Sequence, residues 1–503
     1  MHFGREKTQK ARNVDFALLG RPLWSPFGVD TDNVPDPRTE HLVSIDKAQA
    51  DGLKAKLRGP MHLPGEPGYD DNRSVWNGMI DKKPAAIVRC LGVADVVACV
   101  HFARENGIKI AVKGGGHNIA GLAVCDDGLV LDMGLMRGVW VHPKEKHAHA
   151  QAGCLLGDVD RETQVHGLAA VLGFVSNTGI AGLTLGGGFG YLTSRWGWTC
   201  DNVESVDIVT AEGKLVRATE AEHPDLLWGL RGGGGNFGVA TGFTYRLYPV
   251  GPEIIGGPIA WPAENAEAVL ALHREFTASA PPECAVVAVM RVAPPAPWIA
   301  KEMHGKPIVM LLVCDTGPLA EAEKRVAPLK AFLKPVGDVC IKRSYVSLQN
   351  LLDATQPKGR RYYWKSEFLP SLGEEMTKTW MANAAKISSP HGAMVLFPIG
   401  KAVGEKPAGH SAVGNRDARW VLNITAAWDK PEDDAKQIEW ARSAWRDMQS
   451  FSTGGTYVNF LNAEEGDDRT RAAYGANHAR LAQVKKTWDP GNLFSANKNI
   501  VPA

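Results

Sequence analysis

The sequence has few of the features that mark secreted, membrane-spanning or metal-binding proteins. Its eight cysteines are scattered and include no Cys-x-x-Cys pair, which argues against a zinc ribbon, a dithiol redox motif and a disulfide framework. His147-x-His149 has no further metal ligand at a known spacing. No apolar run approaches the roughly 18 residues that a membrane-spanning helix needs, and residues 1–21 have no apolar core of the kind found in secretory signals. We therefore expect a cytoplasmic protein with no membrane partner and no metal site.

The chain also lacks a surplus of charge. It contains 56 Lys and Arg and 55 Asp and Glu, which gives a formal net charge of +1. This balance provides no bulk attraction to nucleic acid, so the expected partner is a small molecule. A chain of 503 residues with 44% hydrophobic and 22% charged residues is expected to fold as two or three globular domains.

Glycine, in contrast, is concentrated in three clusters. Gly114-Gly115-Gly116 leads directly into His117, and further clusters occupy residues 179–190 and 231–238. None has the glycine fingerprint and following acidic residue of a Rossmann site, and none has a Walker lysine. A flexible linker is the alternative reading, but linkers are usually rich in Ser and polar residues, whereas these clusters have apolar flanks. Because the stretch 179–190 is half glycine, we do not expect it to pack a core. The clusters therefore favour a large phosphate-bearing cofactor held by backbone N–H groups.

Hydrophobic periodicity predicts an α+β protein with its elements in three groups. Residues 1–83 carry many prolines and charges and predict an N-terminal arm or cap. Residues 84–250 predict a two-lobed domain in which His117 follows a strand at 108–113, and residues 251–455 predict an antiparallel sheet backed by helices, a separate substrate domain. The expected strands lie at 86–89, 108–113, 129–132, 147–152, 204–217 (a hairpin), 239–247, 308–315, 361–369 and 419–428. The expected helices lie at 95–106, 156–166, 222–230, 319–332, 374–385 and 431–451.

Several motifs together resemble those of one known family. They are Gly115-Gly116-His117 with Gly121, the glycine-rich stretch 179–190 continuing to Asn202, and a C-terminal series that includes Tyr457-Val458-Asn459, Tyr474-Gly475, Lys485, Asp489-Pro490, Asn492-Leu493-Phe494 and Asn497. From about residue 84 to the C-terminus the chain resembles FAD-linked oxidases of the vanillyl-alcohol oxidase superfamily, in particular the berberine-bridge-enzyme-like branch.

The resemblance implies how the cofactor is held. Residues 84–250 would form the FAD-binding domain, and residues 456–503 would return to it. His117 matches the histidine that the family links to the C8α methyl of FAD. Gly173-Phe174-Val175 stands where some relatives have a second, cysteine attachment, so we expect attachment through His117 alone. The other expected cofactor-binding residues are Gly114, Gly115, Gly116, Asn118, Gly121, Thr178, Gly179, Gly182, Gly186, Gly187, Gly188, Gly190, Asn459 and Asn497.

The resemblance also implies a reaction, in which a substrate alcohol or amine carbon gives a hydride to flavin N5 and oxygen is reduced to hydrogen peroxide. Tyr457 is the expected base, with its alternative a buried tyrosine of structural role. Lys365 could lower the pKa of Tyr457 if strand alternation points it at the flavin. Asn423 stands where some relatives have a catalytic Glu or Gln, and Thr178 where Val favours oxidases and Leu dehydrogenases. A dehydrogenase with another acceptor, and a flavin protein without efficient turnover, stay open as alternatives.

Overall fold

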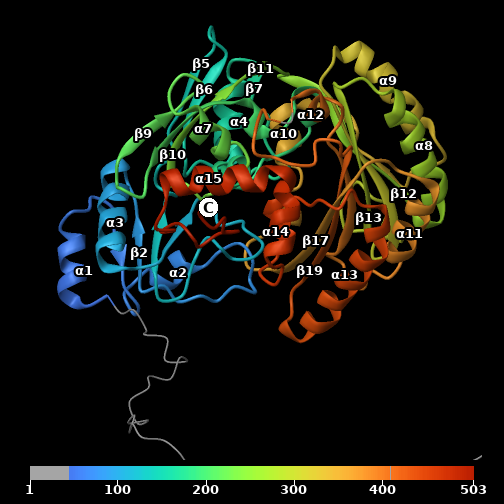
Figure 1. Ribbon diagram of the computed structural model, residues 1–503. Helices are drawn as coiled ribbons and strands as arrows, with labels where there is room; N and C mark the ends of the chain where they lie inside the picture. The colour runs from blue at the N-terminus through green and yellow to red at the C-terminus, as the bar shows by residue number, and fades with distance from the viewer. Residues whose placement is uncertain (1–44, 408) are drawn as a thin grey trace, which may run out of the picture. The chain divides into compact units, whose positions relative to one another are not determined.

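A computed structural model describes residues 45–407 and 409–503, which belong to one compact unit (Figure 1). The part of the predicted N-terminal arm at residues 1–44 lies outside the described residues. In this part of the chain none of the helices has the length and hydrophobicity that crossing a bilayer requires, a finding that applies to the described residues alone.

The first sheet has the order β1-β2-β4-β3, with β2, β4 and β3 parallel. The helix α3 connects β2 to β3 and ends at Gly107, whose φ of 64° gives the left-handed C-cap that glycine favours. Residues 45–83 form two short helices and the strand β1, which pairs with β2. The elements are α1 (Lys47–Lys54), β1 (Met61–His62), α2 (Tyr69–Arg73), β2 (Ala86–Arg89), α3 (Val93–Asn106), β3 (Ile110–Lys113) and β4 (Leu129–Asp132).

The second sheet has the order β5-β6-β10-β8-β9 and is antiparallel throughout. Its inner face shares one hydrophobic core with the first sheet, as the predicted two-lobed domain requires. The short strands β7 and β11, from the same part of the chain, form a separate two-stranded antiparallel sheet. The elements are β5 (Val139–His142), β6 (His147–Gln151), α4 (Leu156–Gln164), β7 (Leu168–Ala169), α5 (Ile180–Leu185), α6 (Thr193–Trp196), β8 (Val203–Val209), β9 (Leu215–Ala218), α7 (Pro224–Leu230), β10 (Val239–Arg246) and β11 (Tyr248–Pro249).

The third sheet has the order β15-β12-β14-β13-β18-β19-β17, with β16 paired to β12. It is antiparallel, as predicted for the substrate domain. Its strands are β12 (Glu253–Pro262), β13 (Cys284–Val292), β14 (Pro307–Asp315), β15 (Gly337–Asp338), β16 (Ile341–Ser344), β17 (Arg361–Leu369), β18 (Ala393–Pro398) and β19 (Trp420–Trp428).

Helices cover one face of this sheet, and strand alternation divides its side chains between that face and a cavity. On β13, Ala288 and Met290 pack against the helices, whereas Val287, Val289 and Arg291 line the cavity. Figure 1 shows α8, α9, α11 and α13 along the covered face. The helices of this region are α8 (Ala266–Ser279), α9 (Leu319–Ala331), α10 (Tyr345–Gln349), α11 (Glu374–Ala384), α12 (Ala402–Glu405) and α13 (Asp434–Met448).

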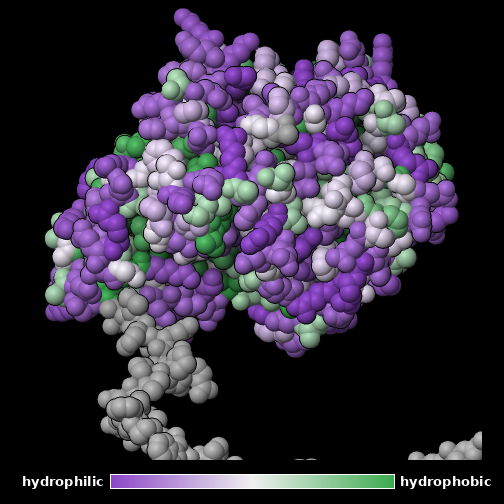
Figure 2. Space-filling view, viewed as in Figure 1, coloured by the Kyte–Doolittle hydropathy of each residue, from purple (hydrophilic) through white to green (hydrophobic). Residues whose placement is uncertain are grey.

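The last segment of the chain packs against the first two sheets. Leu481, Phe494 and Ile500 belong to the same hydrophobic core as those sheets. The helices α14 (Asp467–Tyr474) and α15 (His478–Trp488) precede a final stretch that runs along the third glycine cluster, where Asn497 Nδ2 donates to Gly235 O at 3.2 Å. On the face shown in Figure 2, apolar surface gathers below α15, between the first sheet and α14.

Candidate functional site

A cavity of about 390 Å³ lies where the third sheet meets the glycine clusters. This volume is within the usual range for ligand sites, roughly 300–1,000 Å³. All three glycine clusters contribute to its wall, together with the uncovered face of the third sheet and the segments 457–460 and 496–498. Residues from the two halves of the chain therefore border one space.

The glycine clusters serve both loop packing and the cavity wall. A Cβ on Gly115 would lie 2.4 Å from Gly179 N, so the first two clusters are in backbone contact that a side chain would prevent. In contrast, a Cβ on Gly182 or Gly235 would meet no atom within 4 Å. Because both residues line the cavity, their missing side chains leave room for a ligand close to the backbone.

The second glycine cluster is more ordered than its composition suggests. Its first half forms α5, with Gly179 as N-cap. Ile180 and Leu185 of this helix are buried and belong to the core that the first two sheets share. The expectation that this stretch packs no core is therefore wrong, because its few large apolar side chains are enough to anchor a short helix.

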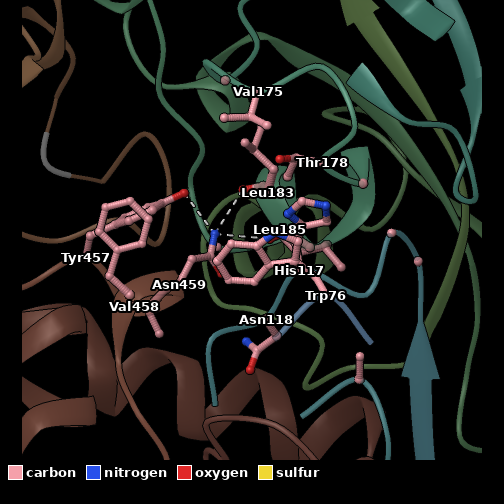
Figure 3. Close-up of a pocket in the computed structure, with 18 of the residues that line it drawn as sticks. Trp76, His117, Asn118, Val175, Thr178, Leu183, Leu185, Tyr457, Val458 and Asn459 are labelled. Carbon is pink, nitrogen blue, oxygen red and sulfur yellow. Dashed lines mark hydrogen bonds between the residues drawn. The ribbon is translucent and has the colours of Figure 1, made fainter. Parts of the chain in front are cut away.

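His117 lies on the cavity wall, after a turn in which Gly116 has a φ of 72°. The indole of Trp76 stacks against the imidazole with ring centroids 5.2 Å apart (Figure 3), and the backbone N–H of Trp76 donates to Gly116 O at 3.0 Å. Burial lowers the pKa of His117 to about 4, an effect that the Asn177 backbone partly offsets. The imidazole is therefore neutral at pH 7, with a lone pair on one ring nitrogen.

The Tyr457 side chain lines the cavity from the segment before a short 3-10 helix, Val458–Phe460. Its Oη accepts a hydrogen bond from Asn459 Nδ2 at 2.8 Å (Figure 3) and another from Gly188 N at 3.1 Å. Burial raises the pKa of Tyr457 above its usual value, although these two donors oppose the shift. The phenol is therefore protonated in this arrangement. It can ionise only if a bound ligand lowers its pKa further.

Lys365 does not provide that help, because the condition on which its expected role depended, a side chain that points at the cavity, is not met. Strand alternation on β17 points Trp364 into the cavity and Lys365 to the face that α13 covers. There Lys365 Nζ lies 3.2 Å from Glu464 Oε1, 3.3 Å from Glu465 Oε1 and 4.9 Å from the centroid of the Trp445 ring. Since both faces of β17 are largely buried, the sequence alone could not assign the direction of either side chain.

Asn423 lines the cavity on β19, and its Oδ1 is buried without a hydrogen-bond partner within the described residues. Asn497 Oδ1 and Tyr474 Oη, which belong to other lining residues, are also buried without a hydrogen-bond partner within the described residues. Buried polar atoms of this kind cost roughly 1–3 kcal/mol each unless something pairs with them. A ligand with several hydrogen-bonding groups would satisfy them.

The other expected cofactor-binding residues separate into two groups. Those that line the cavity are Gly114, Gly115, Gly116, Asn118, Thr178, Gly179, Gly182, Gly186, Asn459 and Asn497. Gly121, Gly187, Gly188 and Gly190 do not line it; they shape the surrounding loops. The sequence gives no signal for Trp76, because residues 1–83 show no periodicity that would mark a single Trp.

The charges on the cavity wall are also unexpected from the sequence. Arg291 and Lys498 line it, and among the described lining residues there is no Asp or Glu. Lys498 Nζ donates to Asn462 O at 2.5 Å and to Glu465 O at 3.0 Å. Arg291 is held by backbone carbonyls rather than by a lining carboxylate, so its end of the cavity suits a ligand that carries negative charge, whereas the ammonium of Lys498 has the Glu465 and Asp467 carboxylates as charge neighbours.

Comparison with known proteins identifies relatives along nearly the whole chain. Residues 84–219 match the FAD binding domain family, and residues 456–501 match the berberine and berberine-like family. The chain is 30% identical to (R)-6-hydroxynicotine oxidase of Paenarthrobacter nicotinovorans over 469 residues, 90% of this chain and 99% of that protein. It is 28% identical to an FAD-linked oxidoreductase of Dictyostelium discoideum over 449 residues, 89% and 95% of the two chains.

A solved structure shares this architecture. The crystal structure of 6-hydroxy-D-nicotine oxidase from Arthrobacter nicotinovorans superimposes with a TM-score of 0.80 at 28% identity, over 89% of this chain and 98% of that one. The expected fold class, a two-lobed FAD-binding domain with a separate antiparallel substrate sheet, is confirmed.

The residues present fit FAD. The backbone-lined openings at Gly182 and Gly235 accept a ligand at close approach. The unpaired polar atoms of Asn423, Asn497 and Tyr474 can bond to the heteroatoms of a ring system or ribityl chain.

Proposed function

The chain belongs to the berberine-bridge-enzyme-like family of FAD-linked oxidoreductases. We propose that this protein carries FAD covalently on His117 and acts as an oxidase on a small organic molecule. That it is an FAD-dependent oxidoreductase follows from the family itself. The use of oxygen and the covalent bond are the parts we propose. In that bond a ring nitrogen of His117 would replace one hydrogen of the C8α methyl of FAD, with two protons released and two electrons passed to oxygen.

One observation carries the proposal: the imidazole of His117 lies on the cavity wall, directly after the first glycine cluster. A pKa of about 4 keeps its nitrogen unprotonated, as bond formation to carbon requires. The stacking of Trp76 and the tight Gly116 turn fix the ring in place. When bound, FAD supplies an acceptor for the hydride of a substrate alcohol or amine carbon.

Tyr457 is the residue we propose to take the proton from the substrate heteroatom, as the phenolate that forms when ligand binding lowers its pKa and its own proton is released to solvent. Its Oη lies at the cavity, and two N–H donors already point at the oxygen that would become negative. The absence of any lining Asp or Glu in the described chain leaves no carboxylate for this task. The apolar surroundings, including Phe189 and Phe460, exclude water from the proton transfer.

Reoxidation of the reduced holoenzyme in air tests the choice of oxygen as acceptor. After photoreduction under argon, mixing with air-saturated buffer is expected to restore the oxidised absorbance rapidly with one hydrogen peroxide per flavin. Thr178, which lines the cavity, gives the matched pair. Thr178→Val keeps the side-chain shape and should keep the rate, whereas Thr178→Leu should slow it. Slow reoxidation of the wild type, with no peroxide, would instead identify a dehydrogenase.

Replacement of Tyr457 by Phe is expected to lower the rate of flavin reduction by about 10²-fold or more, with a substrate that a screen has identified. The change removes the proposed proton acceptor and leaves Gly188 N without its partner, whereas Asn459 Nδ2 keeps its hydrogen bonds to the carbonyls of Gly182 and Leu183. Stopped-flow absorbance measures this rate directly. Tyr345→Phe is the control, because it removes a buried hydroxyl away from the cavity. A near-normal rate in Tyr457→Phe would refute the role of base.

A further inference from the structure

Arg291 is a cation at the cavity that the proposed reaction does not use. It is on β13, and its Nε and Nη2 donate to the carbonyls of Val292 at 3.2 Å and Pro390 at 3.3 Å. None of the ion pairs formed within residues 45–407 and 409–503 includes it; the carboxylate of Asp429 pairs with Arg360 and His391 instead. Its remaining N–H groups are therefore available to a ligand.

The charges around Arg291 do not neutralise it. Burial of the site and the proximity of the Arg360 guanidinium both lower the pKa of Arg291. The nearby carboxylate, Asp429, is already shared, because Arg360 Nε donates to it at 2.8 Å and His391 Nε2 lies 2.9 Å from it. Two guanidinium groups and one carboxylate leave this end of the cavity with an excess positive charge.

Along β13 and β14 the wall beside Arg291 is apolar, whereas Asn423 and Thr425 add polar groups on β19. Val287 and Val289 on β13 and Leu312 on β14 line the cavity on the same face of the sheet. These side chains have no groups for the hydroxyls of a sugar, and no lining carboxylate in the described chain could pair with an ammonium group. The surface favours an apolar body with an anionic group at one end.

Strand register gives the distance across the sheet from Arg291 to Trp364, a residue close to the Trp76 ring that contacts His117. Arg291 pairs with Ala393 of β18, which pairs with Thr425 of β19, which pairs with Trp364 of β17. Directly paired residues point to the same face, and three strand spacings amount to about 14 Å. The Trp364 ring in turn lies 5.4 Å from the Trp76 ring that stacks on His117.

We propose that the substrate is an organic acid with an apolar body, and that Arg291 binds its carboxylate while the body lies along the β13–β19 face toward Trp364. This inference rests on the proposed function, because it names the substrate class of the same site. A guanidinium with free N–H groups binds a carboxylate through two parallel hydrogen bonds, and this geometry fixes the ligand's direction in the cavity.

Calorimetric titration of the holoenzyme with 5-phenylvalerate and with its uncharged amide, 5-phenylvaleramide, tests this assignment without requiring turnover. The wild type is expected to bind the acid about 10- to 100-fold more tightly than the amide, the usual range for hydrogen bonds to a charged group. Arg291→Met should reduce this preference to within about 2-fold, and Arg291→Lys should keep part of it. Arg446→Met is the matched control, since Arg446 is on α13 and pairs with Glu439.

Each outcome either supports or overturns the assignment. A preference for the acid that Arg291→Met abolishes and Arg446→Met preserves supports it. Equal binding of acid and amide, binding of neither, or a preference that survives Arg291→Met overturns it. Flavin absorbance is measured on every variant: loss of flavin in Arg291→Met alone would assign the cation to the cofactor and also overturn it. Absence of flavin from all variants would refute the proposed function, while an Arg291-dependent preference in the same samples would still support the acid site.

Discussion

The His117→Ala variant is expected to release all of its flavin on denaturation, whereas the wild type retains it. His117 provides the nitrogen that we propose to be bonded to FAD, and its pKa of about 4 keeps that nitrogen unprotonated. Removal of the bond leaves FAD held only by the glycine clusters and the polar groups of the cavity, so turnover should also be slower. Fluorescence of acid-washed denaturing gels, followed by mass mapping of the flavin-bearing peptide, measures the result.

The control for this experiment is a second histidine of the same cavity. His391 lines the cavity but pairs with Asp429, and burial lowers its pKa as it does for His117. His391→Ala should therefore retain fluorescent flavin after denaturation. Flavin that stays on the chain in His117→Ala would show that another residue carries it, and a wild type with no flavin on the chain would refute covalent attachment.

The cofactor half of the site could be predicted from the sequence because its signals are local. Gly114, Gly115, Gly116 and His117 are consecutive, and the strand that precedes them is a short apolar run bounded by Gly107 and the cluster itself. A turn, its histidine and the strand before it all depend on neighbours in sequence. The structure has β3 at Ile110–Lys113, within the predicted strand, and His117 follows it on the cavity wall.

The substrate half could not be predicted to the same depth, because its strands have two buried faces. The sequence does not predict the strands Cys284–Val292 and Ala393–Pro398. Helices cover one face of each strand, and the other face is part of the largely buried cavity wall. Such strands show no alternation of polar and apolar residues. Periodicity therefore does not give the direction of Lys365 and Arg291, which depends on tertiary packing.

The C-terminal motif that contributed to the family resemblance includes a buried ion pair with a structural task. Lys485 and Asp489 are both fully buried, with Nζ 2.5 Å from Oδ2. Lys485 Nζ also donates to Asn236 O at 2.7 Å and Phe494 O at 3.0 Å, while Asp489 accepts from the backbone N–H groups of Leu493 and Phe494. The pair therefore joins the third glycine cluster to the end of the chain.

Lys485→Met is expected to lower the free energy of unfolding by about 3–5 kcal/mol, because it leaves Asp489 charged and buried without its cation. For a chain of this size that corresponds to a fall of roughly 3–5 °C in the unfolding midpoint, measured by tryptophan fluorescence. Lys486→Met is the matched control, because the neighbouring lysine is exposed and its loss should leave the midpoint unchanged. Since Lys485 holds the carbonyl of Asn236 beside the cavity, the variant should also lose FAD faster on heating once His117 is replaced by Ala. Equal midpoints for the two lysine variants would show that the buried pair contributes no net stability.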